Sequence, residues 1–412
     1  MVALADSYKL EIEFPTSASF GNAFVLDTGL LDSSSSAKLG GNAYADVTTE
    51  VMEVSISRGR SRQLDQFDSG TLSFVLKNNT REYDPTNTAG VYFGGIQPRR
   101  PVRFTANSTY LFNGWIDDWN IDYSVPTQSK VTISCVDAFS IFASIELDEF
   151  TFTNGERTNQ RIVSLLALPE LANTTVVTSL EQGESTLADD TVALGTSALD
   201  YLQRINQSEQ GYLFINGNGE LRFRKRTTSY SATIPLFTDQ TPVSPNQYKY
   251  ISVGVQFGTE LLYNRVTVTN EGGTTQTAQE AVSQTDFLVR SLNITDLILE
   301  NDTQALAIAN FLLGKYQRPE FRYDSVTISL SGLSTANQNT LFALEPNDLV
   351  EIERNFTVGS PLSVSKYAVI EGITHSISTA EHSITYTLSP AQGSLRLDNV
   401  TFGILDSNTL GI

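Results

Sequence analysis

Apolar and polar residues alternate in short runs along the first third of the chain. The alternation has a period of two in segments between Tyr8 and about Phe150, namely KLEIEF, EVMEVSISRG, TLSFVLKN, PVRFTA and KVTISCVD. This period places apolar side chains on one face, so each segment predicts a half-buried strand. Spacers rich in Gly, Pro, Asn and Asp separate the runs. Short strands without a strong helix predict a first β-barrel or sandwich, which we assign to residues 1–150.

The periodicity becomes helical after residue 150. In NGERTNQRIVSLLAL the apolar residues recur at helical spacing, at Ile162, Leu165, Leu166 and Leu168. A second amphipathic helix is predicted from about Ser197 to Gln210, with Ser197 and Asp200 as a cap pair and Gly211 as the stop. The Asn-Gly-Asn-Gly centre of YLFINGNGELRFRKR then predicts a hairpin. Residues 151–235 therefore predict a small α+β module.

The last part of the chain returns to strands around one clear helix. Strand patterns occur in YISVGVQF, YNRVTVTN, RYDSVTISLS, NDLVEIER, YAVIEGITHSIS and HSITYTLSP. The helix is predicted at about residues 302–316, with Asp302 as its N-cap. Its apolar face consists of Leu306, Ala309 and Leu313. Residues 236–412 thus predict a second β-barrel domain with this inserted helix and a C-terminal tail, and the fold class is mainly β with α+β insertions.

The charge balance argues against a protein that grips nucleic acid. The 412 residues carry 27 Lys and Arg against 46 Asp and Glu, a formal net charge of −19. Nucleic-acid binding needs cations that neutralise phosphates, so we expect no specific nucleic-acid partner. An acidic pore wall would instead let DNA slide past without sticking.

Cysteine usage and hydropathy bear on the compartment. Cys135 is the only cysteine, so folding in a reducing cytosol without an intrachain disulfide is the simple interpretation. Its neighbours in VTISCVDAF predict a buried strand position rather than a nucleophile. The first residues lack the basic start and apolar run of a signal peptide, and no window approaches the roughly 20 apolar residues that span a bilayer. We expect no membrane partner.

His375 and His382 are the only histidines, which limits the possible catalytic and metal sites. Neither lies near a nucleophile signature, so no Ser-His-Asp or Cys-His arrangement is supported. They fall in adjacent strands of a predicted hairpin, with Glu381 nearby as a further ligand type. A metal site would need a third ligand with distinctive spacing, so cross-strand packing of the two rings is the favoured interpretation.

Asp117 and Asp118 in FNGWIDDWN are the best paired carboxylates. A polysaccharide hydrolase needs two carboxyl groups roughly 5–10 Å apart across the sugar. Neighbouring residues of a strand point to opposite faces, so this pair should diverge, and we assign no catalytic residues. Trp115, Trp119 and Tyr110 would form a sugar-binding platform only if they were exposed together, although tryptophans four apart in a strand more often belong to the core.

Two basic stretches invite an anion-site interpretation. Arg58, Arg60 and Arg62 lie just before Asp65 and Asp68, so a local ion-pair cluster is favoured over phosphate binding. The second stretch ends a strand, where a solvated or interface face is the simpler interpretation, and consists of Arg222, Arg224, Lys225 and Arg226. No phosphate-binding loop, calcium loop or dinucleotide fingerprint occurs, and we expect no cofactor or metal.

One segment resembles a known family. Residues 58–85, RGRSRQLDQFDSGTLSFVLKNNTREYDP, resemble minor tail proteins of long-tailed bacteriophages in their arginine-rich opening, Phe-x-x-Gly-Thr step and Tyr-Asp-Pro turn. The likeness extends over most of the chain, each piece being weak alone. Its further segments are FNGWIDDW, VTISCVDAFSIFA, GYLFINGNGELRFRKR, YNRVTVTNEGG, the helix ending in KYQRP, LEPNDLVEIER, VIEGITHSIS and the ending LDNVTFGILDSNTLGI.

The resemblance implies a non-enzymatic tail-tip or baseplate hub, assembled in the host cytoplasm and located in the virion. Such hubs place two β-barrels per subunit around a three-fold ring, with two smaller modules. The implied partners are two further copies of the chain, distal tail or tail-tube proteins, and a central spike, fibre or receptor-binding protein, with genome DNA passing through the lumen. Any large receptor-binding or peptidoglycan-cleaving domain is expected on another chain. The alternatives are a carbohydrate-binding tail adhesin and, less favoured, a polysaccharide hydrolase.

Overall fold

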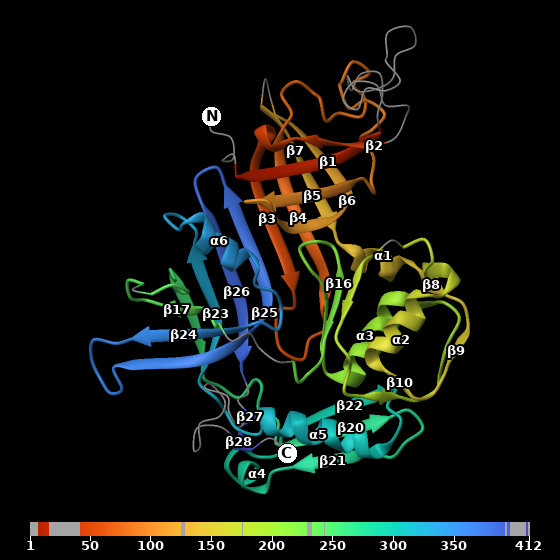
Figure 1. Cartoon of the computed structure of the whole chain (residues 1–412), viewed down its shortest axis with the longest axis vertical. Coiled ribbons are helices and arrows are strands. Elements are labelled where there is room, and N and C mark those ends of the chain that lie inside the picture. Colours follow the sequence, from red (N-terminus) through yellow and green to blue (C-terminus); the bar gives the residue numbers. More distant parts are fainter. Residues whose placement is uncertain are drawn as a thin grey trace.

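A computed structural model describes residues 7–15, 42–124, 128–174, 176–228, 233–242, 244–391, 394–395 and 409–410. Most of the regular structure is β, and the helices other than α6 lie in smaller units beside one large sheet (Figure 1). None of the described helices is long and apolar enough to cross a bilayer. Most of the predicted C-terminal tail lies outside the described residues. The mainly β fold class with α+β insertions is confirmed.

The N-terminal part contributes seven strands of this sheet. They are β1 (Tyr8–Pro15), β2 (Asn42–Asp46), β3 (Val51–Gly59), β4 (Asp68–Lys77), β5 (Pro101–Ala106), β6 (Thr109–Ser124) and β7 (Gln128–Val136), with the 3-10 turn η2 (Thr48–Glu50) before β3. They pair antiparallel in the order β3-β4-β7-β6-β5-β1-β2. Cys135 is buried in β7, which confirms the prediction made for it.

The C-terminal part contributes seven more strands. They are β17 (Leu236–Thr238), β18 (Gln247–Lys249), β19 (Ser252–Gln256), β23 (Arg322–Ser329), β24 (Leu349–Asn355), β25 (Ser363–Ser378) and β26 (His382–Pro390). The helix α6 (Thr335–Phe342) lies between β23 and β24 in the chain. Pairing is antiparallel except at β17, which runs parallel to both β18 and β24.

The long strand β25 joins the two halves. Its residues 363–369 pair with β24, its residues 372–378 pair with β3, and β26 pairs along its other side. Gly372 faces Gly59 where β3 meets β25, and a Cβ on Gly59 would lie 2.4 Å from the carbonyl oxygen of Glu371. Only glycine permits this approach, all the more because Gly59 has a φ of +100°.

Consequently, the strands assigned to two barrels form one 14-stranded sheet. Among the described residues the hydrogen-bonded path runs from β18 to β2, with β26, β23 and β19 branching from β25, and it closes no ring. One hydrophobic core spans both halves, from Leu10 and Phe104 to Ile373 and Tyr386. The predicted hydrophobic alternation is confirmed. The described strands, however, do not close into two separate barrels.

A small α+β unit packs beside the sheet with a core of its own. Its helices are α1 (Ala138–Ser144), α2 (Thr158–Leu166) and α3 (Ala198–Glu209), with the 3-10 turn η3 (Pro169–Leu171). Its strands are β8 (Glu146–Leu147), β9 (Phe150–Phe152), β10 (Glu156–Arg157), β11 (Thr178–Leu180), β12 (Thr186–Leu187), β13 (Asp190–Val192), β14 (Thr196–Ser197), β15 (Tyr212–Ile215) and β16 (Leu221–Arg224). The predicted Asn-Gly hairpin is the antiparallel pair β15-β16.

A second small unit surrounds the predicted helix. It consists of β20 (Arg265–Asn270), β21 (Gln276–Gln279), α4 (Ala281–Phe287), β22 (Ser291–Leu297) and α5 (Asp302–Tyr316). Its three-stranded sheet and α5 share a separate core, so the YNRVTVTN strand, expected in the second barrel, lies outside the large sheet. The short strands β27 (Ser394–Leu395) and β28 (Thr409–Leu410) pair with each other. The domain limits predicted from the sequence, 1–150, 151–235 and 236–412, stay a prediction.

The ranges of α3 and α5 agree with the sequence prediction better than their capping residues do. Ser197 caps α3 by accepting from the Asp200 N–H, as predicted, but Gln210 and not Gly211 takes the left-handed position after the helix. The helix α5 has the predicted range, but its N-cap is Asn301 rather than Asp302. Its buried face is also rotated from the predicted one, since Leu306 is exposed and the buried residues are Ala305, Ile308, Ala309, Leu312 and Tyr316.

Candidate functional site at the junction of the modules

A β-bulge in β25 places a carboxylate at the point where the large sheet and both small units meet. The bulge falls at Glu371, between the stretch of β25 that pairs with β24 and the stretch that pairs with β3. The Glu371 carboxylate is fully buried. It accepts hydrogen bonds from the Arg60 Nε at 2.6 Å, from the Tyr212 hydroxyl at 2.9 Å and from the Ser389 hydroxyl. A bulge redirects a side chain, and here it turns Glu371 toward the junction.

Arg60 is the counter-ion of this carboxylate. Its guanidinium lies 4.6 Å from the Phe67 ring centre and 4.8 Å from that of Tyr212. Burial by itself would raise the pKa of Glu371, but the nearby charges of Arg60 and Lys315 outweigh it and hold the pKa below its usual value. Glu371 therefore stays ionised inside the protein, because it is both paired and hydrogen-bonded.

A cavity of about 940 Å³ opens beside this pair. Its wall combines the β3–β4 loop, α3, β15, the segment after β16, α5, the middle of β25 and the end of β26. Apolar side chains such as Phe67, Phe311 and Val369 alternate with the carboxamides of Gln203, Gln210 and Asn310 along the wall. The cavity has the size of a small-molecule site, and its wall combines apolar and polar surface.

Lys315 in the last turn of α5 lines the same cavity. Burial lowers its pKa to about 8, with Glu371 opposing that effect and Arg60 adding to it. It forms no ion pair with any residue that the structure describes. Its ammonium lies 5.7 Å from the centre of the Tyr316 ring. The cavity wall therefore carries a cation that feels the charge of Glu371 but has no direct ion pair among the described residues.

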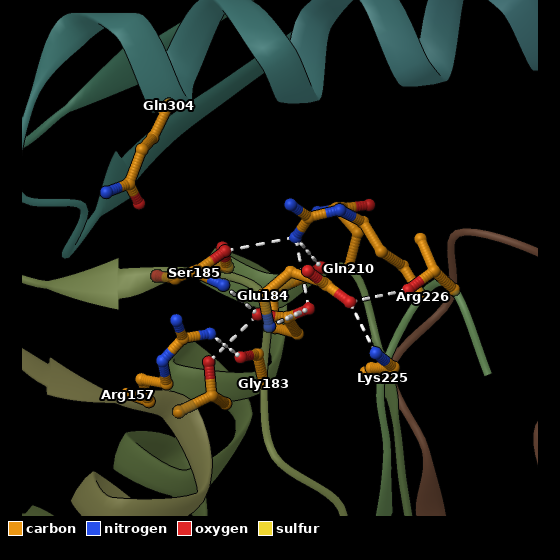
Figure 2. A network of polar contacts seen from close by, with 12 residues as sticks. Arg157, Gly183, Glu184, Ser185, Gln210, Lys225, Arg226 and Gln304 are labelled. Atoms are coloured by element: carbon orange, nitrogen blue, oxygen red, sulfur yellow. Dashed lines mark hydrogen bonds and ion pairs between the residues drawn. The ribbon is translucent and has the colours of Figure 1, made fainter. Parts of the chain in front are cut away.

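A second buried carboxylate holds the small α+β unit together at the edge of the cavity. Glu209 at the end of α3 accepts from Thr158 Oγ1 at 3.0 Å, from the Glu184 N–H at 3.1 Å, from the Ser185 N–H at 2.7 Å and from Arg226 Nη1 at 3.1 Å. Figure 2 shows this network from close by. All four acceptor positions are filled, so Glu209 ties α2, α3, the segment before β12 and the segment after β16 together.

One contact carries this network into the other small unit. The Gln304 side chain of α5 approaches from above in Figure 2, and its Oε1 accepts from the Thr186 N–H at 3.1 Å. Arg157 donates to the Gly183 carbonyl at 2.8 Å on the opposite side. A hydrogen bond thus joins α5 to the small α+β unit, and both of these contribute to the cavity wall.

The basic stretch at the end of β16 was predicted to be a solvated or interface face, but three of its four cations form ion pairs within the chain. Arg224 pairs with Asp348 at 2.7 Å, and Lys225 pairs with Glu184 at 2.5 Å. Arg226 lies against Glu209, as described above. Arg222 only approaches Glu220, at 4.0 Å.

The stretch from Arg58 to Arg62 is ion-paired, as favoured by the sequence, but mainly with distant carboxylates. Arg62 does pair with Asp65, at 3.2 Å, and also with Glu260 at 3.1 Å. Asp68, the other expected partner, forms no ion pair with the described residues.

Arg58, the first arginine of this stretch, is buried. Arg58 pairs with Glu345, which precedes β24, at 2.8 Å. The reason for the distant partners is topological, because β3 pairs with β25 and therefore lies close to carboxylates in β25 and just before β24.

The two histidines pack against each other across the β25–β26 hairpin, as predicted. His375 Nδ1 and His382 Nε2 lie 3.0 Å apart, and the Tyr8 hydroxyl lies 2.9 Å from His382 Nδ1. Burial lowers the pKa of His382 to about 3 and that of His375 well below its usual value. The described residues contain no cluster of three His, Cys, Asp or Glu side chains placed to bind a metal.

Asp117 and Asp118 do not converge on a cleft. Both are exposed on β6, at a bulge between Ile116 and Asp118. The bulge also separates the flanking tryptophans, since Trp115 packs on the core of the small α+β unit and Trp119 on the core of the large sheet. These two aromatic side chains therefore form no common platform for a sugar.

Three strands of the large sheet have an open edge among the described residues, namely β2, β18 and β19. The β19 edge is the most apolar of them. Ile251 is 61% exposed, Val255 46% and Phe257 71%. An open edge flanked by exposed apolar side chains is a template for pairing with another chain. The surface formed by residues 251–257 is called the β19 edge below.

Sequence reasoning missed three charged residues of the junction. Glu371 had a usable signal, because it is the one charge inside the apolar run AVIEGI. Glu209 had another, since an acidic residue at a helix C-terminus is unfavourable with the helix dipole and so demands a partner. Lys315 gave no signal, because a lysine in the last turn of a helix is ordinary.

Comparison with known proteins identifies the fold. No protein-family model and no curated protein sequence matches the chain. Among solved structures, the 43 kDa tail protein of prophage MuSo2 from Shewanella oneidensis is similar with a TM-score of 0.60 and 11% identity, covering 93% of this chain and 98% of that one. The tail protein from Neisseria meningitidis MC58 is similar with a TM-score of 0.58 and 10% identity, covering 93% and 96%. The chain therefore has the fold of phage tail proteins.

Proposed function

We propose that this chain is a structural subunit of a phage-type tail, and that three copies form the hub ring of the tail tip or baseplate. The observation that carries the proposal is the extent of the structural likeness, which covers 93% of this chain and 98% of a prophage tail protein. The match thus involves both halves of the large sheet and both small units. A role in the virion without catalysis agrees with the exposed, non-converging positions of Asp117 and Asp118.

The β19 edge supports the ring. It exposes Ile251, Val255 and Phe257 beside unpaired backbone groups. A stable subunit interface buries such an edge, and identical subunits in a ring use the same surface pair at each contact. We assign the β19 edge to the contact between neighbouring copies.

In this role the ring would cap the tail tube and connect it to the central spike, fibre or receptor-binding protein. The net charge of −19 supports a lumen through which DNA passes, because like charges repel at a pore wall. Another exposed apolar surface lies in the loop between β24 and β25, where Val358 is 80% exposed, and it is our candidate for the contact with another tail protein.

Light scattering of the purified chain tests the ring. A subunit of 45.2 kDa should give a particle of about 136 kDa, three times that mass. Phe257→Asp should shift the mass to that of a single chain, since it places a charge in the apolar contact. Val163→Asp on α2, at a site that is also more than half exposed, is the matched control and should keep the ring. A monodisperse single chain for the unmodified protein would contradict the ring.

Immunogold labelling of purified particles tests the location. Antibodies against the chain should label one end of the tail, opposite the head. Label along the whole tube, or none on intact particles, would contradict a hub at the tip.

A further inference from the structure

The charges in the wall of the junction cavity leave an unbalanced cation. Arg60 is compensated by Glu371, and Arg226 by Glu209, both behind the wall. Asp65, the acidic residue of the lining, is paired with Arg62. Lys315 alone among these lining charges has no ion pair with the described residues. The wall therefore presents one positive charge to whatever enters the cavity.

Two carboxamides in the same wall have polar atoms without partners. The Asn347 Nδ2 and the Asn206 Oδ1 are buried, and neither forms a hydrogen bond with the described residues. Asn347 itself is only 3% exposed. A buried polar atom without a partner is unfavourable, and a bound molecule that supplies the missing bond would remove this cost. Asn347 offers a donor and Asn206 an acceptor.

Part of the lining is apolar, which favours a ligand that carries an apolar portion beside its polar groups. Leu64, Phe67, Leu213, Phe311 and Val369 contribute to the wall. The volume of about 940 Å³ accommodates a molecule larger than a simple ion. A bare anion would satisfy the charge but would leave this apolar surface facing water.

From these features we propose that the junction cavity binds the carboxylate of a partly apolar ligand, with the Lys315 ammonium as its counter-ion and the Asn347 amide as a second donor. One carboxylate balances one ammonium, whereas a phosphate carrying two charges would leave one of them uncompensated. The carboxylate can belong to a free small molecule or to a glutamate within a peptide. The site goes beyond the proposed tail function and does not depend on it.

The protonation of Lys315 gives the site a pH dependence. Because burial lowers the pKa of Lys315 to about 8, the ammonium is present at neutral pH and is lost above that value. Carboxylate affinity should be flat from pH 6 to 7 and should fall about tenfold for each pH unit above about 8. A lysine that only packed against Tyr316 would produce no such profile.

Isothermal titration calorimetry on the full chain tests the site with matched probes. Sodium hexanoate is compared with hexanamide and with inorganic phosphate, and acetyl-Leu-Glu-Leu-amide with acetyl-Leu-Gln-Leu-amide. We expect each carboxylate probe that binds to bind at least about tenfold more tightly than its neutral analogue and than phosphate. Binding of hexanoate would indicate a free small molecule, and binding of the Glu peptide alone a segment of another protein.

Two substitutions assign the binding to the cavity. Lys315→Met keeps the length of the side chain without its charge, and Asn347→Asp replaces the donor by a like charge at nearly constant shape. Each should weaken carboxylate binding by about 10- to 100-fold. Lys366→Met is the matched control, because Lys366 pairs with Glu320 at 3.3 Å and does not line the cavity.

Circular dichroism of each variant shows whether it is folded, and Lys315→Gln replaces Lys315→Met if that variant does not fold. The proposal is overturned if neither carboxylate probe binds, if hexanamide binds as tightly as hexanoate, or if both cavity variants bind like the unmodified chain.

Discussion

Arg60 and Glu371 lie 311 positions apart in the sequence, yet the guanidinium of one donates to the carboxylate of the other at 2.6 Å. The pair lies where β3 takes over from β24 as the neighbour of β25. It is enclosed by the Phe67 and Tyr212 rings. This single contact therefore ties the N-terminal half of the sheet, the C-terminal half and the small α+β unit to one point.

Removing one charge of this pair should be costly. Glu371→Gln keeps the size of the side chain but leaves the Arg60 guanidinium buried without a counter-ion. We expect a loss of about 3–5 kcal/mol in the free energy of unfolding, measured by urea titration. Arg62→Gln is the control, because its ion pairs are exposed, and it should leave the midpoint nearly unchanged. Equal losses of unfolding free energy for the two substitutions would show that the buried pair contributes no more to stability than the exposed ion pairs.

Acid should destabilise the protein through its histidines. The pKa of His382 is lowered to about 3, and that of His375 is also lowered, whereas an unfolded histidine titrates near 6.5. The unfolded state therefore binds more protons as pH falls below about 6.5, and the stabilisation present above that pH is lost down to about pH 3.

Unfolding titrations between pH 7 and 5 measure this loss. The free energy of unfolding should decrease by up to about 1.4 kcal/mol per pH unit for each histidine. A double variant with His375→Gln and His382→Gln should start from a lower stability but show a flatter slope. An unchanged slope would mean that other groups govern the acid response.

The Glu209 network should hold the small α+β unit in place. Glu209→Gln puts an NH2 group where the carboxylate accepts hydrogen bonds, and it leaves Arg226 without its charge partner. We expect a loss of about 3 kcal/mol in the free energy of unfolding and faster amide exchange in α2. Glu184→Gln is the control, because its bond to Lys225 is partly exposed, and it should cost at most about 1 kcal/mol. Equal costs would contradict the role assigned to Glu209.

The start of α5 can be tested directly. Asn301 Oδ1 accepts from the Gln304 N–H at 3.1 Å, so Asn301→Ala should cost about 1 kcal/mol in the free energy of unfolding. Asp302→Asn should cost less, because the Asp302 side chain accepts from Thr274 rather than from its own helix. Thermal denaturation compares the stability lost in the two variants. A larger loss for the Asp302 variant would support Asp302 as the N-cap, as the sequence predicted.

The sequence pattern was sufficient to predict elements that depend mainly on neighbouring residues, such as single strands, a tight hairpin and the range of a helix. Period-two alternation located β3, β4 and β7, and the Asn-Gly turn located the β15–β16 hairpin. The range of α5 followed from helical spacing with polar ends. Its cap did not, because Asn301 and Asp302 are both good capping residues and the choice depends on Thr274, which the sequence alone does not place beside the helix.

The junction could not be derived in the same way. The partners of Arg58 and Arg60 are Glu345 and Glu371, and these become neighbours only because β3 pairs with β25. Strand alternation specifies which face a residue occupies, but it does not specify which strand lies beside it. For the same reason two barrels were inferred where the pairing runs through one sheet, and the cavity between the units was not foreseen.

The length of β25 has a mechanical consequence. Its 16 residues, about 53 Å at 3.3 Å per residue, carry β24 and β3 end to end on one side and β26 on the other. A force applied at the β24–β25 loop and directed along the strand would load the hydrogen bonds from β25 to β3 and to β26 in shear at once, instead of unzipping them one by one. Because such bonds must break together, the joint between β25 and β3 should resist a pull along this strand more strongly than a pull across it.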